Sequence, residues 1–225
     1  MENLKKEFPL MVYINLEDRV DRHLQAEEEF KKVGLSPKRI LGSKIKATGV
    51  SQVDGALGCA MSHLRALQMA KENKCNIFIF EDDVMFINNY EEIVEKAVEE
   101  LQRLDYHMFY LGANILNSHY QISDHLSKLT HAQATHAYGV RYEFLDIAMA
   151  TILLRITNGQ YVIPIDKIYA EVVVPANQCY IVAPKMVAVQ RDSFSDIENT
   201  TSDYESYLEK RYYSNFVPMM KADSL

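Results

Sequence analysis

Three acidic residues follow directly on an apolar run in the segment NIFIFEDDVMF, residues 76–86. Residues 77–80 have no polar face, which is typical of a central parallel strand covered by helices on both sides. Ligands of open α/β sheets bind outside the carboxyl ends of strands, where Glu81, Asp82 and Asp83 stand. If the chain stays extended, Glu81 and Asp83 point to one side of the strand and Asp82 to the other.

Two convergent carboxylates could hold a divalent cation. Mg²⁺ and Mn²⁺ prefer oxygen ligands and commonly bridge to phosphate groups. The triplet therefore indicates a phosphate-linked metal site. The alternative is that these acids cap the next helix or lie in solvent.

A second cluster lies in GALGCAMSHLRAL, residues 55–67. Gly55 and Gly58 permit a tight turn or a close backbone approach, and Ser62 and His63 offer polar contacts early in an apolar helix. The glycine pair falls short of a dinucleotide fingerprint, and a buried histidine is often structural.

A third cluster, INLEDRVDR, places Arg19 and Arg22 just beyond a strand and one helical turn apart. Guanidinium groups at this position could bind phosphate. Alternatively, they lie in an exposed first turn, paired with Asp18 and Asp21.

These clusters need elements to position them, and the apolar periodicity predicts an alternation of strands and helices. Strands are expected over residues 10–15, 75–80 and 107–112, with helices over 17–34, 56–73 and 88–104. In the first helix, Val20, Leu24, Phe30 and Val33 could line the buried face. This order favours an α/β sheet with right-handed crossovers.

The pattern weakens after Gly112. Residues 114–134 have little periodicity and are predicted to form an irregular excursion. Strands are expected over 135–140, 178–184 and 186–190, and helices over 142–157 and 163–173. The polar tail begins at Ser193, and order is expected to decrease after about residue 198. The 225 residues are predicted to form one domain.

The composition limits the function classes. A net charge of −7 disfavours binding to nucleic acid or to an anionic membrane through bulk attraction. Three cysteines without CxxC or Cys/His ligand spacing predict neither a disulfide framework nor a structural zinc site. No apolar run is long enough for a signal peptide or a membrane span. The expected location is the cytoplasm, with peripheral membrane attachment as a further option.

Taken in order, several segments resemble glycosyltransferase family 25, and the likeness covers residues 11–197. They are VYINLEDRVDR, GALGCAMSHLRAL, IFIFEDDV, FYLG, THAYGV, PID and VQRDSFSDI. The family includes bacterial lipooligosaccharide glycosyltransferases and the galactosyltransferase domains of collagen-modifying enzymes. The resemblance implies a GT-A fold, in which a Rossmann-like nucleotide-binding sheet is fused to an acceptor-binding half. It also implies a nucleotide-sugar donor, a glycan or protein acceptor, and Mn²⁺ or Mg²⁺ as cofactor.

The resemblance further implies roles for individual residues. Asp83 is expected to ligate the metal, and Glu81 to contact the ribose or the metal. The donor side is expected to include Asn15, Arg19, Arg22, Gly58, Ser62, His63 and Asp82 as well. His136 and Asp166 match positions near the sugar and acceptor.

The chemistry that this family performs is compatible with these residue types. Cleavage of the bond to a diphosphate builds negative charge that a cation can neutralise, and the acceptor hydroxyl must lose a proton to a nearby base. Because the family is generally inverting, a single displacement is expected. Asp166 is the first choice for the base, followed by His136 and Asp192.

The sequence departs from the family pattern in two respects. It contains no tryptophan, although relatives often have one in the helix after the SH pair. Residues 115–134 match no motif, which leaves the acceptor open. The nucleotide and sugar are also open, with UDP-galactose and UDP-glucose as the predicted donors.

Other functional classes were weighed against a transferase. A family relative could bind a nucleotide sugar or a partner without catalysis. A metal-dependent hydrolase could use His136 and Asp166 as further ligands. A phosphoryl-transfer receiver domain does not fit, because such domains carry their acid pair after the first strand, where this chain has INLEDR.

Overall fold

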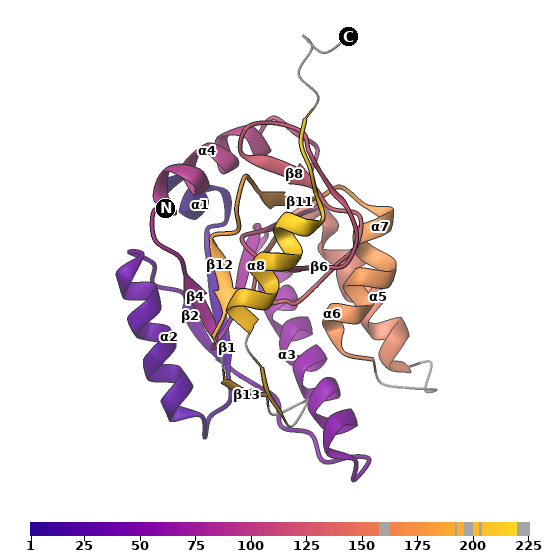
Figure 1. The fold of residues 1–225 in the computed structure, drawn as a ribbon. Coiled ribbons are helices and arrows are strands. Elements are labelled where there is room, and N and C mark those ends of the chain that lie inside the picture. Colours follow the sequence, from indigo (N-terminus) through magenta and orange to yellow (C-terminus); the bar gives the residue numbers. More distant parts are fainter. Residues whose placement is uncertain (158–162, 192, 196–199, 203, 220–225) are drawn as a thin grey trace.

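The computed structural model describes residues 1–157, 163–191, 193–195, 200–202 and 204–219. Within this part, a nine-stranded sheet forms the centre of the molecule, in the order β15-β7-β8-β11-β5-β10-β3-β1-β2 (Figure 1). The sheet is mixed. One half has the nucleotide-binding arrangement that the sequence predicts, and the other is built from short strands.

The first half contains three parallel strands: β1 (Leu10–Asn15), β2 (Lys38–Leu41) and β3 (Ile77–Glu81). Helix α2 (Val20–Lys32) links β1 to β2, and α3 (Ser51–Asn73) links β2 to β3. These connections lead to opposite sides of β1, and α2 and α3 lie on either side of this strand in Figure 1. Strands β1 and β3 therefore flank a topological switch point, where the crevice for ligands opens at their carboxyl ends.

Strand β10 (Ala137–Val140) departs from the predicted crossover pattern, because it runs antiparallel between β3 and β5 (Met108–Tyr110). The excursion after β5 returns the chain to the sheet edge where β3 and β5 end. Ala137 pairs with Phe80. The register consequently places residues 135–136 beside the end of β3.

The prediction of an irregular excursion over residues 114–134 is wrong. The segment contains β6 (Asn114–Ile115), β7 (His119–Gln121), β8 (Leu126–Lys128) and β9 (Ala132–Gln133). β6 pairs with β9, β7 pairs with β8, and β8 joins β11 (Cys179–Val182) in the main sheet. Strands of two or three residues are too short to show an alternating pattern, which explains the error.

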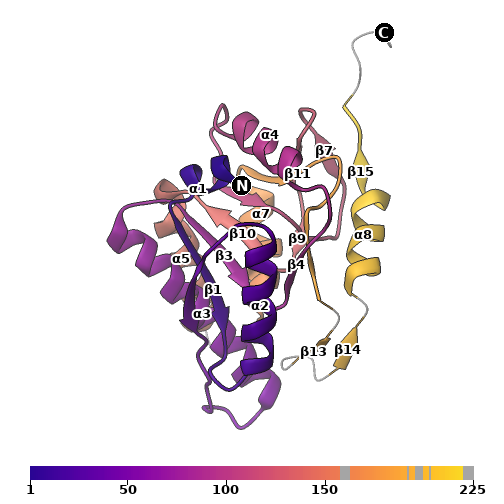
Figure 2. The ribbon, with the colours of Figure 1, turned by 90° about the vertical axis from the view of Figure 1, so that its left-hand side faces the viewer.

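The C-terminal tail contains α8 (Tyr204–Ser214) and β15 (Phe216–Val217), which pairs with β7. Leu208 and Tyr212 are buried, and the Tyr212 hydroxyl donates to the Val182 carbonyl at 2.7 Å. Figure 2 shows α8 and β15 along one side of the molecule, away from α3 and α5. The tail therefore docks onto the sheet edge through an apolar contact and a buried hydrogen bond.

The remaining elements cover the faces and edges of this sheet. They are α1 (Glu2–Glu7), β4 (Val84–Phe86), α4 (Glu91–Leu101), η1 (Tyr142–Phe144), α5 (Leu145–Thr157), α6 (Ile165–Ile168), the π-helix η2 (Tyr169–Val173), α7 (Val174–Ala176), β12 (Ala188–Gln190), β13 (Ser193–Ser195) and β14 (Thr200–Ser202). β4 pairs with β12, which brings the chain after the acidic triplet against the chain before residue 191.

The buried faces predicted for two helices agree with the structure to different degrees. For the helix expected over residues 88–104, the apolar spacing predicts a buried stripe of Tyr90, Ile93, Val94, Ala97, Val98, Leu101 and Leu104. In α4, the buried residues are Val94, Ala97, Val98 and Leu101, all of which belong to this stripe. In α2 the predicted face is only partly correct. Phe30 and Val33 are buried, but Val20 and Leu24 are 55% and 61% exposed. Leu24 and Phe30 are six residues apart, which separates them by roughly 120° around a helix.

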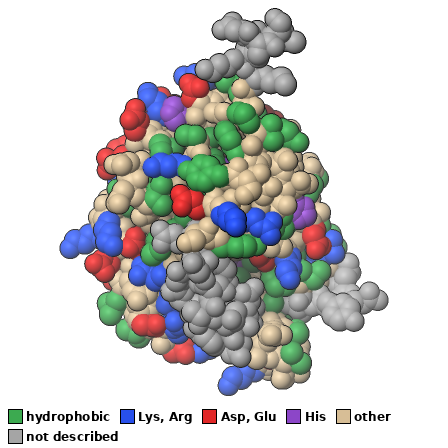
Figure 3. Space-filling view, viewed as in Figure 1, with side chains coloured by type: hydrophobic (Ala, Val, Ile, Leu, Met, Phe, Trp, Pro, Cys, Tyr) green, Lys and Arg blue, Asp and Glu red, His purple; other side chains and the backbone are tan. Residues whose placement is uncertain are grey.

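The surface carries mixed charges. On the face shown in Figure 3, basic and acidic side chains are interspersed among apolar and polar ones. Cys59, Cys75 and Cys179 form no disulfide. Among the residues described, no helix combines the length and apolar character that crossing a membrane requires.

Candidate active site

The acidic triplet lies at the carboxyl end of β3, and its three carboxylates have different partners. Asp82 is held by two side chains from the β1–α2 region. Asn15 Nδ2 donates to Asp82 Oδ2 at 2.7 Å, and Arg22 Nη1 donates to Asp82 Oδ1 at 2.9 Å. Burial raises the pKa of Asp82, and the charge of Arg22 opposes that effect. Asp82 thus ties the end of β3 to the start of α2.

Asp83 has fewer partners, and its side chain is 13% exposed. Its Oδ1 has no hydrogen-bond partner among the described residues, and its Oδ2 lies 3.8 Å from Arg22 Nη1. Burial, together with the charges of Glu81 and Asp82, raises the pKa of Asp83 to about 7. A buried carboxylate oxygen without a partner, beside two further carboxylates, is a donor set that suits a hard divalent cation. These residues therefore fit the predicted metal.

Glu81 faces a different group of residues. Thr135 Oγ1 donates to Glu81 Oε1 at 2.5 Å, and His63 Nε2 lies 3.4 Å from the same oxygen. The other ring nitrogen of His63 forms a hydrogen bond with the Tyr138 hydroxyl at 2.8 Å. Burial alone would raise the pKa of Glu81, but the interactions with His63 and Thr135 outweigh it and lower this pKa. Glu81 and Asp82 thus contact different residue groups. The predicted alternation does not extend through the triplet, because β3 ends at Glu81, residues 82–83 form a turn, and Arg22 lies beside both Asp82 and Asp83.

Gly58 and Ser62 shape the backbone near this cluster. A Cβ atom on Gly58 would lie 2.2 Å from the Ser43 carbonyl oxygen, so the loop before α3 approaches the helix closely here. Ser62 Oγ donates to the Gly58 carbonyl at 2.7 Å and accepts from Ser43 N at 2.8 Å. The alternative of a tight turn is wrong, because Gly55 and Gly58 both lie inside α3.

The two arginines of the first cluster have different surroundings. Arg22 reaches the triplet through Asp82. Arg19 stands at the N-cap of α2 and donates to both carboxylate oxygens of exposed Asp21, at 3.1 and 3.0 Å. The surface pairing considered from the sequence thus holds for Arg19, and Arg22 is the arginine that contacts the acidic triplet.

Two of the three predicted bases lie near the cluster. Asp166 stands in the first turn of α6, and its Oδ1 accepts from Lys167 N at 2.8 Å. Burial raises the pKa of Asp166, and the charge of Glu81 adds to this effect. His136 is fully buried, with Nε2 3.2 Å from the Ala188 carbonyl oxygen.

Burial lowers the pKa of His136, which favours the neutral imidazole. In the tautomer that donates from Nε2 to Ala188, the lone pair is on Nδ1, which has no partner among the described residues. Asp192 lies outside the described residues.

The sequence analysis gave no role to several residues that the structure places here. Arg39 Nη2 donates to Asn15 Oδ1 at 2.5 Å. The amide of Arg191 donates to the Asp83 carbonyl at 2.7 Å. Thr135 and Arg191 are adjacent in sequence to the predicted site residues 136 and 192. This adjacency is the sequence feature that could have indicated their place in the site. Arg39 stands in β2, where sequence reasoning predicted no element.

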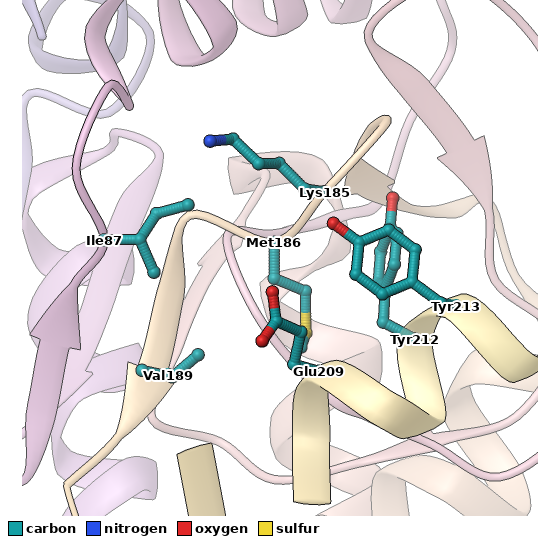
Figure 4. A pocket seen from close by; sticks show the side chains of 7 residues that line it. All are labelled: Ile87, Lys185, Met186, Val189, Glu209, Tyr212 and Tyr213. Atoms are coloured by element: carbon teal, nitrogen blue, oxygen red, sulfur yellow. The ribbon is translucent and has the colours of Figure 1, made fainter. Parts of the chain in front are cut away.

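A separate pocket lies between α8 and the chain that leads into β12 (Figure 4). Figure 4 shows Glu209 and Tyr213 extending from α8 near Met186. The lining residues are Ile87, Lys185, Met186, Val189, Glu209, Tyr212 and Tyr213. None of them is a predicted site residue. Ile87 follows the triplet by four positions, which connects this pocket to the candidate site through β4.

The α/β sheet, with its switch point at β1 and β3 and its acidic triplet at the carboxyl end of β3, has a fold of the GT-A type. The sequence model of glycosyltransferase family 25 (LPS biosynthesis protein) matches residues 36–147. Over this range, about half of its length, the chain is similar to this glycosyltransferase family. The matched range includes the acidic triplet, His63 and His136.

A viral protein is similar to this chain in sequence. The chain is 26% identical over 171 residues to a procollagen lysyl hydroxylase and glycosyltransferase of Acanthamoeba polyphaga mimivirus. The match covers 67% of this chain and 19% of the viral protein, so this chain spans about a fifth of its relative.

Its fold is similar to that of a glycosyltransferase involved in glycosylation of the major capsid of PBCV-1. The TM-score is 0.50 at 12% identity, over 84% of this chain and 95% of the other. A putative glucose-1-phosphate thymidylyltransferase from Bacillus anthracis gives a TM-score of 0.41 at 10% identity, over 95% of this chain and 79% of the other.

Proposed function

We propose that the chain is a metal-dependent, inverting hexosyltransferase that moves galactose or glucose from a UDP-sugar to a hydroxyl group of a glycan or protein. The observation that carries this proposal is the Asp83 carboxylate, whose buried Oδ1 has no hydrogen-bond partner among the described residues and which lies beside two further acids. Three carboxylates held so close together need a cation to balance their charge when all are ionised.

Asp83 would hold Mn²⁺ or Mg²⁺, with Glu81 contributing a direct or a water-mediated contact. When bound, such an ion neutralises the negative charge that develops on the departing diphosphate. Asp82 would hold neighbouring side chains in position, because Asn15 and Arg22 already donate hydrogen bonds to its two oxygens. The remaining donor contacts would come from the β1–α2 region and from the start of α3.

The transfer would be a single displacement. The acceptor oxygen forms a bond to the anomeric carbon as the bond to the diphosphate oxygen breaks, and UDP leaves with that electron pair. Asp166 would take the hydroxyl proton, because its raised pKa suits a general base better than that of an exposed carboxylate. His136 is less suited, because it is fully buried and one ring nitrogen lies at hydrogen-bond distance from Ala188.

A thermal-shift screen of nucleotide sugars, with and without Mn²⁺, tests the donor assignment. A ligand that binds only the folded protein stabilises it and so raises its melting temperature. At a ligand concentration one hundred times Kd, the added stability is about 2.7 kcal/mol. UDP-galactose or UDP-glucose should give the largest shift, and Mn²⁺ should be required. A larger shift with another nucleotide, or one independent of Mn²⁺, would refute the donor or metal assignment respectively.

Donor hydrolysis separates a catalyst from a relative that only binds. In the presence of Mn²⁺, the wild-type protein should release UDP from the donor. Asp83→Ala should abolish the reaction, whereas Asp166→Asn should still bind the donor but transfer slowly. Equal release of UDP by wild type and Asp83→Ala would favour a catalytically silent protein.

A further inference from the structure

A second group of potential metal ligands lies beside the acidic triplet. The cysteine spacing predicted no zinc site, but Cys59 and His63 are four residues apart on α3 and so face the same side of the helix. Glu81, at the end of β3, completes the group. One ligand atom from each of these three residues lies within 4.8 Å of the other two.

The imidazole of His63 is oriented as a metal ligand would be. It is fully buried, and Nε2 has no hydrogen-bond partner among the described residues, although it lies 3.4 Å from Glu81 Oε1. The other ring nitrogen is held by the Tyr138 hydroxyl at 2.8 Å. When Nδ1–H donates to this hydroxyl, Nε2 carries the lone pair and lies 3.4 Å from Glu81 Oε1. Histidines that bind metals are held in this way by a second partner.

The types of ligand distinguish this group from the triplet. Carboxylates alone suit Mg²⁺ and Mn²⁺, but a thiolate and an imidazole prefer a softer ion, above all Zn²⁺. Three protein ligands leave one position of a tetrahedral ion open for water or another ligand. The surrounding charge is also favourable to a cation. Burial raises the pKa of the Cys59 thiol above its ordinary value, and the negative charges of Glu81, Asp166, Asp83 and Asp82 add to this effect.

We propose that Cys59, His63 and Glu81 form a binding site for Zn²⁺ or a similar borderline-soft divalent ion, separate from the Mn²⁺ ligand Asp83. Binding requires that the thiol lose its proton, which leaves to solvent as the sulfur–metal bond forms. Glu81 belongs to both groups of ligands. An ion at Cys59 and His63 therefore also binds Glu81 and alters the position of this side chain beside the donor site. The site thus provides a way for zinc to act on the transferase.

Cobalt provides a direct test, because a Co²⁺–thiolate bond produces a charge-transfer absorption band that carboxylate ligands do not give. Addition of Co²⁺ to the wild-type protein should produce this band at one ion per chain, and Zn²⁺ should remove it. Cys59→Ser should abolish the band, whereas Cys75→Ser and Asp83→Asn should retain it. Tyr138→Phe should weaken Co²⁺ binding by about tenfold, because it releases the second ring nitrogen.

A second measurement needs no variant. Zn²⁺ should slow alkylation of Cys59, measured by peptide mass spectrometry, while Cys75 in the same sample reacts at an unchanged rate. Absence of the band in the wild-type protein, or alkylation of Cys59 at the same rate with and without Zn²⁺, would overturn the proposal. These readouts do not depend on the donor, so they stand or fall separately from UDP-sugar binding and transfer.

Discussion

Replacement of Asp83 by asparagine should stabilise the metal-free protein at neutral and higher pH. The pKa of Asp83 is raised from 3.8 to about 7, so the folded protein holds this proton more tightly than the unfolded chain does. The contribution of this protonated side chain to the free energy of unfolding is fully present below about pH 4 and is lost as the pH rises through 7. Asparagine is neutral throughout, and therefore Asp83→Asn should not lose this contribution.

The magnitude follows from the size of the pKa change. Each pH unit by which a pKa moves corresponds to about 1.4 kcal/mol, so the full change amounts to about 4 kcal/mol. This figure is an upper value, because structural relaxation and water entry reduce the cost of a buried charge. We expect Asp83→Asn to exceed the wild type by roughly 2 to 4 kcal/mol at pH 8, and by almost nothing at pH 4.

Urea unfolding between pH 4 and pH 8 measures this difference. Far-ultraviolet circular dichroism is the suitable probe, since the chain contains no tryptophan. A chelator removes any bound cation. A gap between the two proteins that does not change with pH, or a wild type that is the more stable at pH 8, would refute the reasoning.

Asp82→Asn is a matched control with the opposite expectation. Asp82 has nearly the same chain position as Asp83, but both of its oxygens accept hydrogen bonds, from Asn15 and from Arg22. Neutralisation would remove the negative charge that lies 2.9 Å from Arg22 Nη1, in a site where the Arg22 side chain is only 12% exposed. Breaking a buried ion pair in this way costs about 3 kcal/mol, so this variant should be less stable than the wild type at pH 8.

Two further predictions follow from the contacts around the site. Gly112→Ala would place a Cβ atom 1.8 Å from the Ala188 carbonyl oxygen, and it should lower the free energy of unfolding by about 1 to 3 kcal/mol or more, measured by urea titration. Arg22→Ala should lower stability by about 3 kcal/mol and weaken UDP-sugar binding, because it removes the cation beside buried Asp82. Arg19→Ala should change stability by less than about 1 kcal/mol, because Asp21, its ion-pair partner among the described residues, is an exposed carboxylate. Equal losses in the two variants, compared by calorimetry and unfolding, would contradict this distinction.

The position of the acidic triplet could be predicted from sequence because its signal is local. An apolar run that ends in acids indicates a central strand whose carboxyl end is polar, and the structure confirms this for β3. The stripe of α4 was equally clear, since its buried residues recur at helical spacing over almost three turns.

The partners of these residues could not be predicted, because they depend on contacts between distant segments. Thr135 lies 54 positions from Glu81 in the sequence and reaches it only because antiparallel β10 lies beside β3. The helical spacing of Arg19 and Arg22 likewise did not distinguish which of the two contacts the acidic triplet. Which of them reaches Asp82 depends on the direction in which each side chain leaves α2.

Isothermal titration of a UDP-hexose into wild-type and Asp83→Asn protein, with and without Mn²⁺, tests the central claim most directly. The account predicts that the wild type binds the donor in a Mn²⁺-dependent manner. It also predicts that the folded Asp83→Asn variant loses this dependence together with most of its affinity. Equal binding by both proteins, unaffected by Mn²⁺, would contradict the assignment of Asp83 as the metal ligand.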